Sequence, residues 1–85
     1  MYTIIFRPKA EQQLKKLDPL IQQRILNVLD RLKINPFSHD ITRLVGSSYY
    51  RAKAGKYRII LDIKQDKLII IVIEIGLRHK IYDKY

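Results

Sequence analysis

Residues 44–63 read LVGSSYYRAKAGKYRIILDI, an alternating pattern that predicts two β-strands joined at Gly55. Successive side chains of a strand point to opposite faces of a sheet. One face of this hairpin therefore carries the apolar side chains of Tyr50, Ala52, Ala54, Ile59, Leu61 and Ile63. The opposite face carries the cations Arg51, Lys53 and Arg58. The pattern thus predicts a positively charged face on a β-sheet.

The register of this hairpin depends on its turn. We predict a two-residue turn at 54–55, because glycine in the second turn position accepts the positive φ that a tight hairpin needs. This turn places Arg51 across from Arg58. It also places Lys53 across from Lys56. A three-residue turn is the alternative, and it would move every side chain to the other face because the side-chain period is two.

Two helices are predicted by apolar side chains at helical spacing, the first beginning at Pro8 and the second running from Asp18-Pro19 to Asn35-Pro36. Further strands are predicted at Tyr2–Phe6, Ile41–Val45 and Leu68–Ile75. The uninterrupted apolar character of the last strand indicates a central position, and the face that Glu74 takes stays open. We therefore predict an α+β fold of order β-α-α-β-β-β, a two-layer sandwich in which a helical hairpin packs on a small, mostly antiparallel sheet.

The composition limits the class of protein. A chain of 85 residues that is 47% hydrophobic and 29% charged is expected to form one folded domain over residues 1–85. It contains no cysteine, which excludes disulfides and thiolate metal sites. The first residues do not read as a secretion signal, and the apolar run Leu68–Ile73 is too short to cross a bilayer. We expect a cytoplasmic protein with no membrane partner.

The net charge of +9 arises from 17 Lys and Arg against 8 Asp and Glu. Such an excess points to a polyanionic partner, either nucleic acid, an acidic protein, or both. A basic surface that serves only solubility is the alternative. Strand alternation groups part of the charge on one face, and this grouping favours the polyanion.

Several kinds of catalytic site are disfavoured. The two histidines, His39 and His79, lie far apart in sequence and no Asp or Glu stands at ligand spacing, so no metal or other cofactor is predicted. There is no glycine-rich phosphate loop, and two histidines with scattered serines do not indicate a Ser-His-Asp triad. What remains is a set of Arg, Lys and Tyr side chains, which suits phosphate binding or phosphate chemistry.

RNA can be cut without a metal when its 2′-hydroxyl attacks the neighbouring phosphorus. The site then needs a base, cations around the phosphate and a proton donor for the leaving oxygen. Arginine suits the cationic role because its planar fork meets two phosphate oxygens. A lysine among arginines loses its proton more readily because like charges repel, so Lys53 is a candidate base. Tyr82 or His79 is a candidate for supplying the departing proton or for stacking on a base.

Each of these residues also has a purely structural interpretation. Arg51 and Lys53 could be only solvent-facing strand residues, and Arg58 could form an ion pair with Asp62 or Glu74. His79 could be an ordinary surface histidine. Tyr50 and Tyr57 are interpreted as aromatic side chains that pack on the sheet. Arg78 follows directly after a predicted strand, a place where binding residues often lie.

A resemblance to a known family rests on three motifs. They are Leu44-x-Gly46, Tyr50-Arg51-x-Lys53-x-Gly55-x-Tyr57-Arg58-Ile59-Ile60 and Ile75-Gly76-x-Arg78-x-x-Ile81-Tyr82. Together they resemble the RelE/ParE superfamily of toxins from toxin–antitoxin systems. The likeness also covers the opening strand, the helical hairpin and Lys16-Leu17 at its turn.

The resemblance implies a RelE-type toxin that enters the ribosomal A site and cleaves the bound mRNA, leaving a 2′,3′-cyclic phosphate. It implies catalytic roles for Lys53, Arg58, Arg78 and Tyr82, and RNA or phosphate binding by Arg51, Lys56, His79 and Lys80. It also implies two partners, the ribosome with its mRNA and rRNA, and a cognate acidic, RelB-like antitoxin. The toxin alone is expected to be a monomer and to form a hetero-oligomer with the antitoxin.

Two positions depart from the family pattern. Arg51 stands where the ribosome-cleaving type often has lysine, and Leu77 stands where many relatives have His or Lys. Two other functions therefore stay open. One is a ParE-like inhibitor of DNA gyrase, and the other is a non-catalytic basic module that binds RNA or an acidic partner.

Overall fold

The sheet and its helices are described by a computed structural model that covers residues 1–38, 41–78 and 80. Its elements are, in order, β1 (Thr3–Phe6), α1 (Pro8–Lys15), α2 (Pro19–Ile34), β2 (Ile41–Arg43), β3 (Tyr50–Ala54), β4 (Tyr57–Lys64) and β5 (Ile69–Leu77). Within these residues the strands form one sheet in the order β1-β5-β4-β3-β2. Strand β1 runs parallel to β5, and the other neighbouring pairs are antiparallel.

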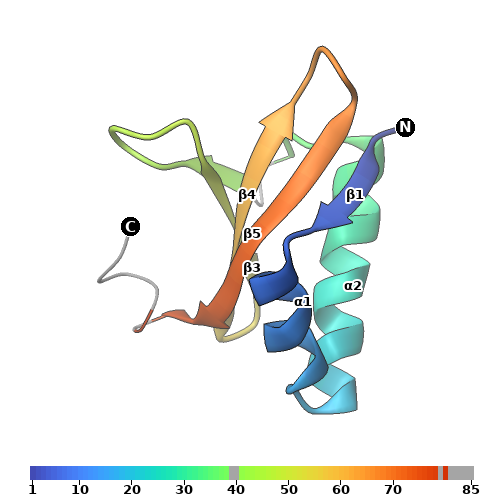
Figure 1. Cartoon of the computed structure of the whole chain (residues 1–85), viewed down its shortest axis with the longest axis vertical. Helices are drawn as coiled ribbons and strands as arrows, with labels where there is room; N and C mark the ends of the chain where they lie inside the picture. The colour runs from blue at the N-terminus through green and yellow to red at the C-terminus, as the bar shows by residue number, and fades with distance from the viewer. Residues whose placement is uncertain (39–40, 79, 81–85) are drawn as a thin grey trace.

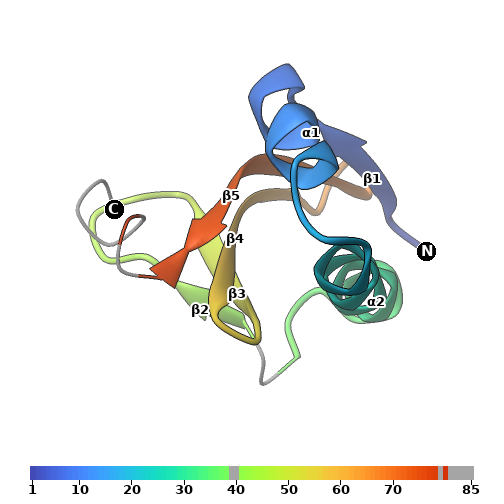
Figure 2. The ribbon, with the colours of Figure 1, turned by 90° about the horizontal axis from the view of Figure 1, so that it is seen from below.

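Both helices lie on one side of the strongly curved sheet (Figures 1 and 2). The predicted α+β two-layer fold with a mostly antiparallel sheet is therefore confirmed. The described part of the chain has the five strands predicted one by one, whereas the predicted order β-α-α-β-β-β counted only four of them; the strand predicted at Ile41–Val45 is β2, which pairs with β3. That strand ends at Arg43, two residues earlier than predicted.

The ends of the helices follow local capping rules. Pro8 occupies the start of α1, where its missing N–H is not needed. The carboxylate of Asp18 accepts a hydrogen bond of 2.9 Å from the backbone N–H of Leu20 and so caps α2. The side-chain amide of Gln22 donates to the carbonyl oxygen of Leu17 at 2.7 Å. This bond ties the second helix to the tight turn before it.

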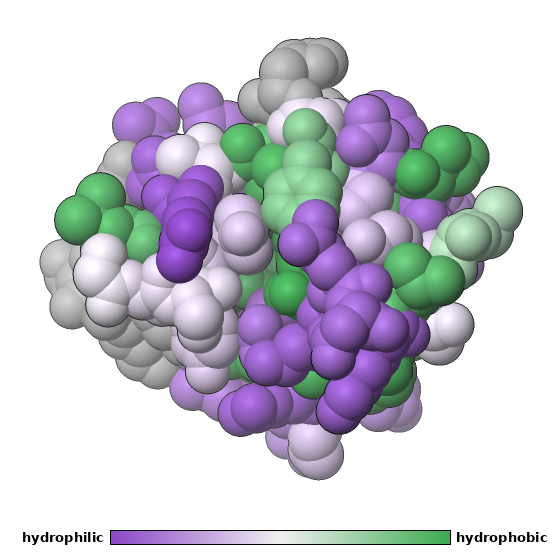
Figure 3. Space-filling view, turned by 90° about the horizontal axis from the view of Figure 1, so that it is seen from above, coloured by the Kyte–Doolittle hydropathy of each residue, from purple (hydrophilic) through white to green (hydrophobic). Residues whose placement is uncertain are grey.

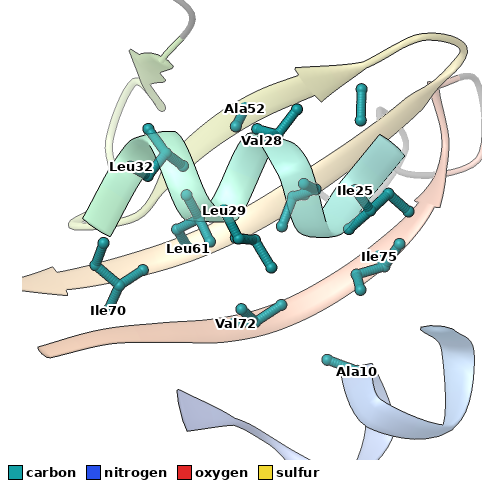
Figure 4. Close-up of a cluster of buried hydrophobic side chains, with 12 residues drawn as sticks. Ala10, Ile25, Val28, Leu29, Leu32, Ala52, Leu61, Ile70, Val72 and Ile75 are labelled. Carbon is teal, nitrogen blue, oxygen red and sulfur yellow. The ribbon is translucent and has the colours of Figure 1, made fainter. Parts of the chain in front are cut away.

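The main core lies between the helices and the sheet (Figure 4). Its buried members are Ala10, Ile25, Val28, Leu29, Leu32, Ala52, Ala54, Ile59, Leu61, Ile70, Val72 and Ile75. Each fully buried Leu or Ile side chain contributes about 1.5–3 kcal/mol relative to exposure. The apolar face predicted for the hairpin is confirmed, since all six of its predicted residues belong to this core or pack against it. Tyr50 and Tyr57 are among those that pack against it, as their structural interpretation expected.

Strand β5 lies between β1 and β4 and is mostly buried, which confirms its predicted central position. Its pairing with β4 contains a bulge: Ile60 lies opposite Glu74, while Leu61 lies opposite Val72. Ile73 is thus an extra residue on β5. The sequence left open which face of the sheet Glu74 takes. Its cross-strand partner Ile60 lies on the face away from the helices, so Glu74 lies on that face as well.

The predicted turn of the β3–β4 hairpin is wrong by one position. The turn residues are Gly55 and Lys56, and Ala54 pairs with Tyr57. Gly55 has a φ of 63°, so the residue with the left-handed conformation takes the first turn position and not the second. This change moves each cross-strand partner by two residues, which keeps every side chain on its predicted face.

The surface mixes polar and apolar areas. Figure 3 looks onto the end of the molecule that contains the β4–β5 turn, and it shows hydrophilic side chains gathered beside separate hydrophobic patches. Exposed large apolar residues of the described chain include Met1, Leu20, Ile34, Val45 and Leu68. None of the helices in the described ranges is long and apolar enough to cross a membrane.

Candidate nucleic-acid interface

The centre of the candidate site is a like-charged pair on the face of the sheet away from the helices, which we call the open face. Lys53 on β3 lies directly opposite Arg58 on β4. The predicted partners, Lys56 for Lys53 and Arg58 for Arg51, are wrong because the turn is shifted. Lys53 is exposed, whereas Arg58 is only 3% exposed. Two cations from neighbouring strands are thus held side by side on this face.

Arg51 extends this charge along β3. It lies on the same face as Lys53, opposite Ile60 on one side and Thr42 on the other, and it is half-buried. The three predicted strand cations therefore do share one face of the sheet. Along β3, Arg51 is half-buried, and Lys53, which lies nearer the hairpin turn, is exposed.

The chain beyond β5 returns to the same end of the sheet. The backbone N–H of Arg78 donates to the carbonyl oxygen of Lys56 at 3.1 Å, which holds Arg78 at the hairpin turn. The side chains of Lys56, Arg78 and Lys80 are exposed. Figures 1 and 2 show the end of β5 and the β3–β4 turn lying at one end of the molecule. Predicted site residues from three segments are thus brought to one region.

Two predicted site residues, His79 and Tyr82, lie outside the described residues. Both carboxylates considered as partners for Arg58 contact lysines. The Nζ atom of Lys64 lies 3.2 Å from Asp62 Oδ2, and that of Lys9 lies 3.3 Å from Glu74 Oε1. Within the described ranges, no three His, Cys, Asp or Glu side chains lie close enough together to hold a metal ion.

The sequence did not predict the apolar part of the open face. Leu44, Ile60 and Ile73 are buried there, and Tyr49 and Ile71 pack against them. Ile60 was recognised only as a break in the alternation, and the bulge at Ile73 has no local sequence signal. The open face is therefore divided into an apolar area and the cationic area formed by Arg51, Lys53 and Arg58.

The chain matches a known family of proteins. Residues 4–82 match the family described as the ParE toxin of type II toxin–antitoxin systems, parDE. The chain belongs to this family. It is a toxin of a type II toxin–antitoxin system, within the RelE/ParE superfamily that the three sequence motifs resemble. That resemblance is therefore confirmed.

Individual relatives agree with this assignment. The toxin is 31% identical over 85 residues to a protein of Methanocaldococcus jannaschii named as toxin RelE1, covering 95% of this chain and 94% of that one. A RelB–RelE antitoxin–toxin complex from Methanococcus jannaschii has a chain of 26% identity with a TM-score of 0.74, covering 95% of the toxin and 98% of that chain. The fold also matches the isolated RelE toxin of E. coli with a TM-score of 0.81, at 21% identity, over 99% of the toxin and 94% of that chain.

Proposed function

We propose that this toxin is a metal-independent endoribonuclease that cuts mRNA in the ribosomal A site. The observation that carries the proposal is the exposed Lys53 amine directly opposite the buried Arg58, on a cationic face close to Arg78. A phosphodiester at this position would meet the exposed amine of Lys53 on this cationic face. Three segments then supply cations around one phosphate, as the transition state of RNA cleavage requires.

In the proposed reaction, the Nζ atom of Lys53 accepts the proton of the 2′-hydroxyl. The 2′-oxygen attacks phosphorus and the bond from phosphorus to the 5′-oxygen breaks, while Tyr82 donates a proton to that leaving oxygen. The products are a 2′,3′-cyclic phosphate and a 5′-hydroxyl. Arg58 and Arg78 stabilise the charge that develops on the non-bridging oxygens. Arg51, Lys56, His79 and Lys80 bind the flanking phosphates.

The proposal includes two partners. One is the ribosome with its mRNA and rRNA, which places the activity in the cytoplasm. The other is an acidic antitoxin that covers the basic surface. RelB antitoxins accompany related toxins in solved complexes, and the net charge of +9 favours an acidic partner. We expect a monomeric free toxin and a hetero-oligomer with the antitoxin.

The test uses ribosomes programmed with an end-labelled mRNA. We expect the purified toxin to cut this mRNA and to spare the same RNA free in solution, and the upstream product should end in a 2′,3′-cyclic phosphate. Lys53→Ala should reduce the cleavage rate by about 10²–10⁴-fold, the usual effect of losing a general base. The matched control is Lys67→Ala, which removes an exposed lysine of the β4–β5 turn and should cleave at the normal rate. Equal cleavage by both variants would remove Lys53 from the mechanism.

A second candidate function is inhibition of DNA gyrase, and the ParE description of the matching family favours it. A supercoiling assay separates the two functions, because a gyrase inhibitor blocks supercoiling at low toxin concentration and cuts no RNA. A non-catalytic basic module would behave differently from both. It would bind RNA with a steep dependence on salt and would cleave nothing under any condition.

A further inference from the structure

A small hollow lies on the helix side of the β3–β4 hairpin, away from the open face. It has a volume of about 130 Å³ and is lined by Ile21, Arg24, Ala54, Lys56 and Tyr57. The floor is apolar, since Ile21 and Ala54 face the core, and the half-buried ring of Tyr57 forms a wall. Arg24 and Lys56 are exposed and complete the lining with two cations.

The side chain of Arg24 lies close to the glycine of the hairpin turn. A Cβ atom added to Gly55 would stand 2.5 Å from Arg24 Nη1 and 3.4 Å from its Cδ. With a Cβ atom at this position, the flexible end of the Arg24 side chain would have to shift. The arginine of α2 lies at the same place as Lys56 of the turn, although the two belong to different layers of the fold (Figure 2).

The two cations that line the hollow differ from several other cations of the surface in their ion pairing. Lys9, Lys15, Lys33 and Lys64 each contact a carboxylate. Among the residues that the structure describes, no ion pair joins Arg24 or Lys56 to a carboxylate. Both side chains are exposed, so an anion from outside the protein can reach them. An aromatic wall and an apolar floor beside two such cations suit a ligand that joins a flat ring to a phosphate.

We propose that this hollow binds one unpaired nucleotide of an RNA strand. The base stacks against the ring of Tyr57 over the apolar floor. The guanidinium of Arg24 binds two oxygens of the adjacent phosphate, and Lys56 contacts the same or the next phosphate as a point charge. The hairpin tip then carries RNA-binding groups on both faces, with Lys53 on the open face and the hollow on the helix side.

The choice of RNA as the ligand rests on the proposed function, so the test measures equilibrium binding and not cleavage. Fluorescence anisotropy compares the free toxin on a labelled 12-nucleotide oligoadenylate and on an abasic oligomer of the same length and charge. We expect about tenfold tighter binding to oligoadenylate, because only this RNA can stack on Tyr57. Tyr57→Phe should keep this preference and Tyr57→Leu should lose it. Thermal denaturation establishes that both variants are folded.

The phosphate contact is tested with Arg24→Gln against the matched control Arg7→Gln. Both arginines are exposed, and Arg7 lies at the start of α1 and does not line the hollow. We expect Arg24→Gln to weaken oligoadenylate binding about tenfold and to reduce the slope of log K against log salt by about 0.7, the loss of one phosphate contact on a single strand. Arg7→Gln should change the affinity by less than about twofold.

Two results would overturn the inference. One is equal affinity for oligoadenylate and the abasic oligomer, which would show that no base is bound. The other is binding of a glutamate-rich peptide with the same dependence on Arg24 and no such dependence for oligoadenylate, which would assign the hollow to a protein partner. Ribosomal cleavage that depends on Lys53 could hold in either case, so the failure of this inference and that of the proposed function are distinguishable.

Discussion

Lys53 and Arg58 form a like-charged pair across two antiparallel strands, and only one member of the pair is exposed. Arg58 is 3% exposed and Lys53 stands at the surface beside it. The two cations therefore differ in what they contribute. Besides its proposed role at the phosphate, the buried guanidinium of Arg58 is part of the folded framework, whereas the amine of Lys53 is exposed.

The first prediction separates these contributions with two neutral substitutions. Lys53→Gln should abolish most mRNA cleavage and change the free energy of unfolding by less than about 0.5 kcal/mol, because Lys53 is exposed. Arg58→Gln should also abolish cleavage and lower the free energy of unfolding by about 3 kcal/mol, because it disturbs a buried charged group. Urea denaturation and the ribosome assay measure both effects. Equal stability losses for the two variants would contradict the assignment.

The second prediction concerns the left-handed glycine of the hairpin turn. Gly55 has a φ of 63° and Gly46, in the loop before β3, has a φ of 73°. Changing either residue to alanine should destabilise the toxin by about 1–2 kcal/mol, because a Cβ atom disfavours this conformation. An added Cβ at Gly46 meets nothing within 4 Å, while one at Gly55 meets Arg24. Gly55→Ala alone should therefore also weaken oligoadenylate binding, and normal binding would show that the guanidinium needs no such space.

The third prediction compares two ion pairs of similar length. Lys9 contacts Glu74, whose side chain is 9% exposed, whereas Lys15 contacts Glu11, whose side chain is 52% exposed. Lys9→Met should lower the free energy of unfolding by about 1 kcal/mol, because the carboxylate that loses this contact is buried. Lys15→Met should cost less than about 0.5 kcal/mol, and that cost should vanish in 1 M salt. Thermal unfolding at low and high salt measures both, and similar costs for the two lysines would contradict the role given to burial.

The fourth prediction tests the core under α2. Leu29 is 2% exposed and packs between the helix and the sheet (Figure 4), so Leu29→Ala should lower the free energy of unfolding by about 3 kcal/mol. Leu20 lies on the same helix and is 81% exposed, so Leu20→Ala should change it by less than about 0.5 kcal/mol. Chemical denaturation gives both values. A small loss for Leu29→Ala would mean that α2 is not firmly packed on the sheet.

The faces of the hairpin were predictable from sequence because strand alternation is a local property. The partners across the strands were not, since Gly55 could take either turn position and each choice keeps the same faces. The bulge at Ile73 escaped prediction because it lies within an uninterrupted apolar run. The contact between Arg24 and the turn at Gly55 depends on how α2 packs on the sheet, which no local pattern records.

The position of β1 has a consequence for how the toxin is made. Its residues Thr3 to Phe6 pair only with β5, from Ile69 to Val72, within the described chain. During synthesis β1 therefore has no β partner until β5 has also left the ribosome. Such a distant pairing slows folding. The order in which the chain is made thus separates the two halves of this parallel pair in time.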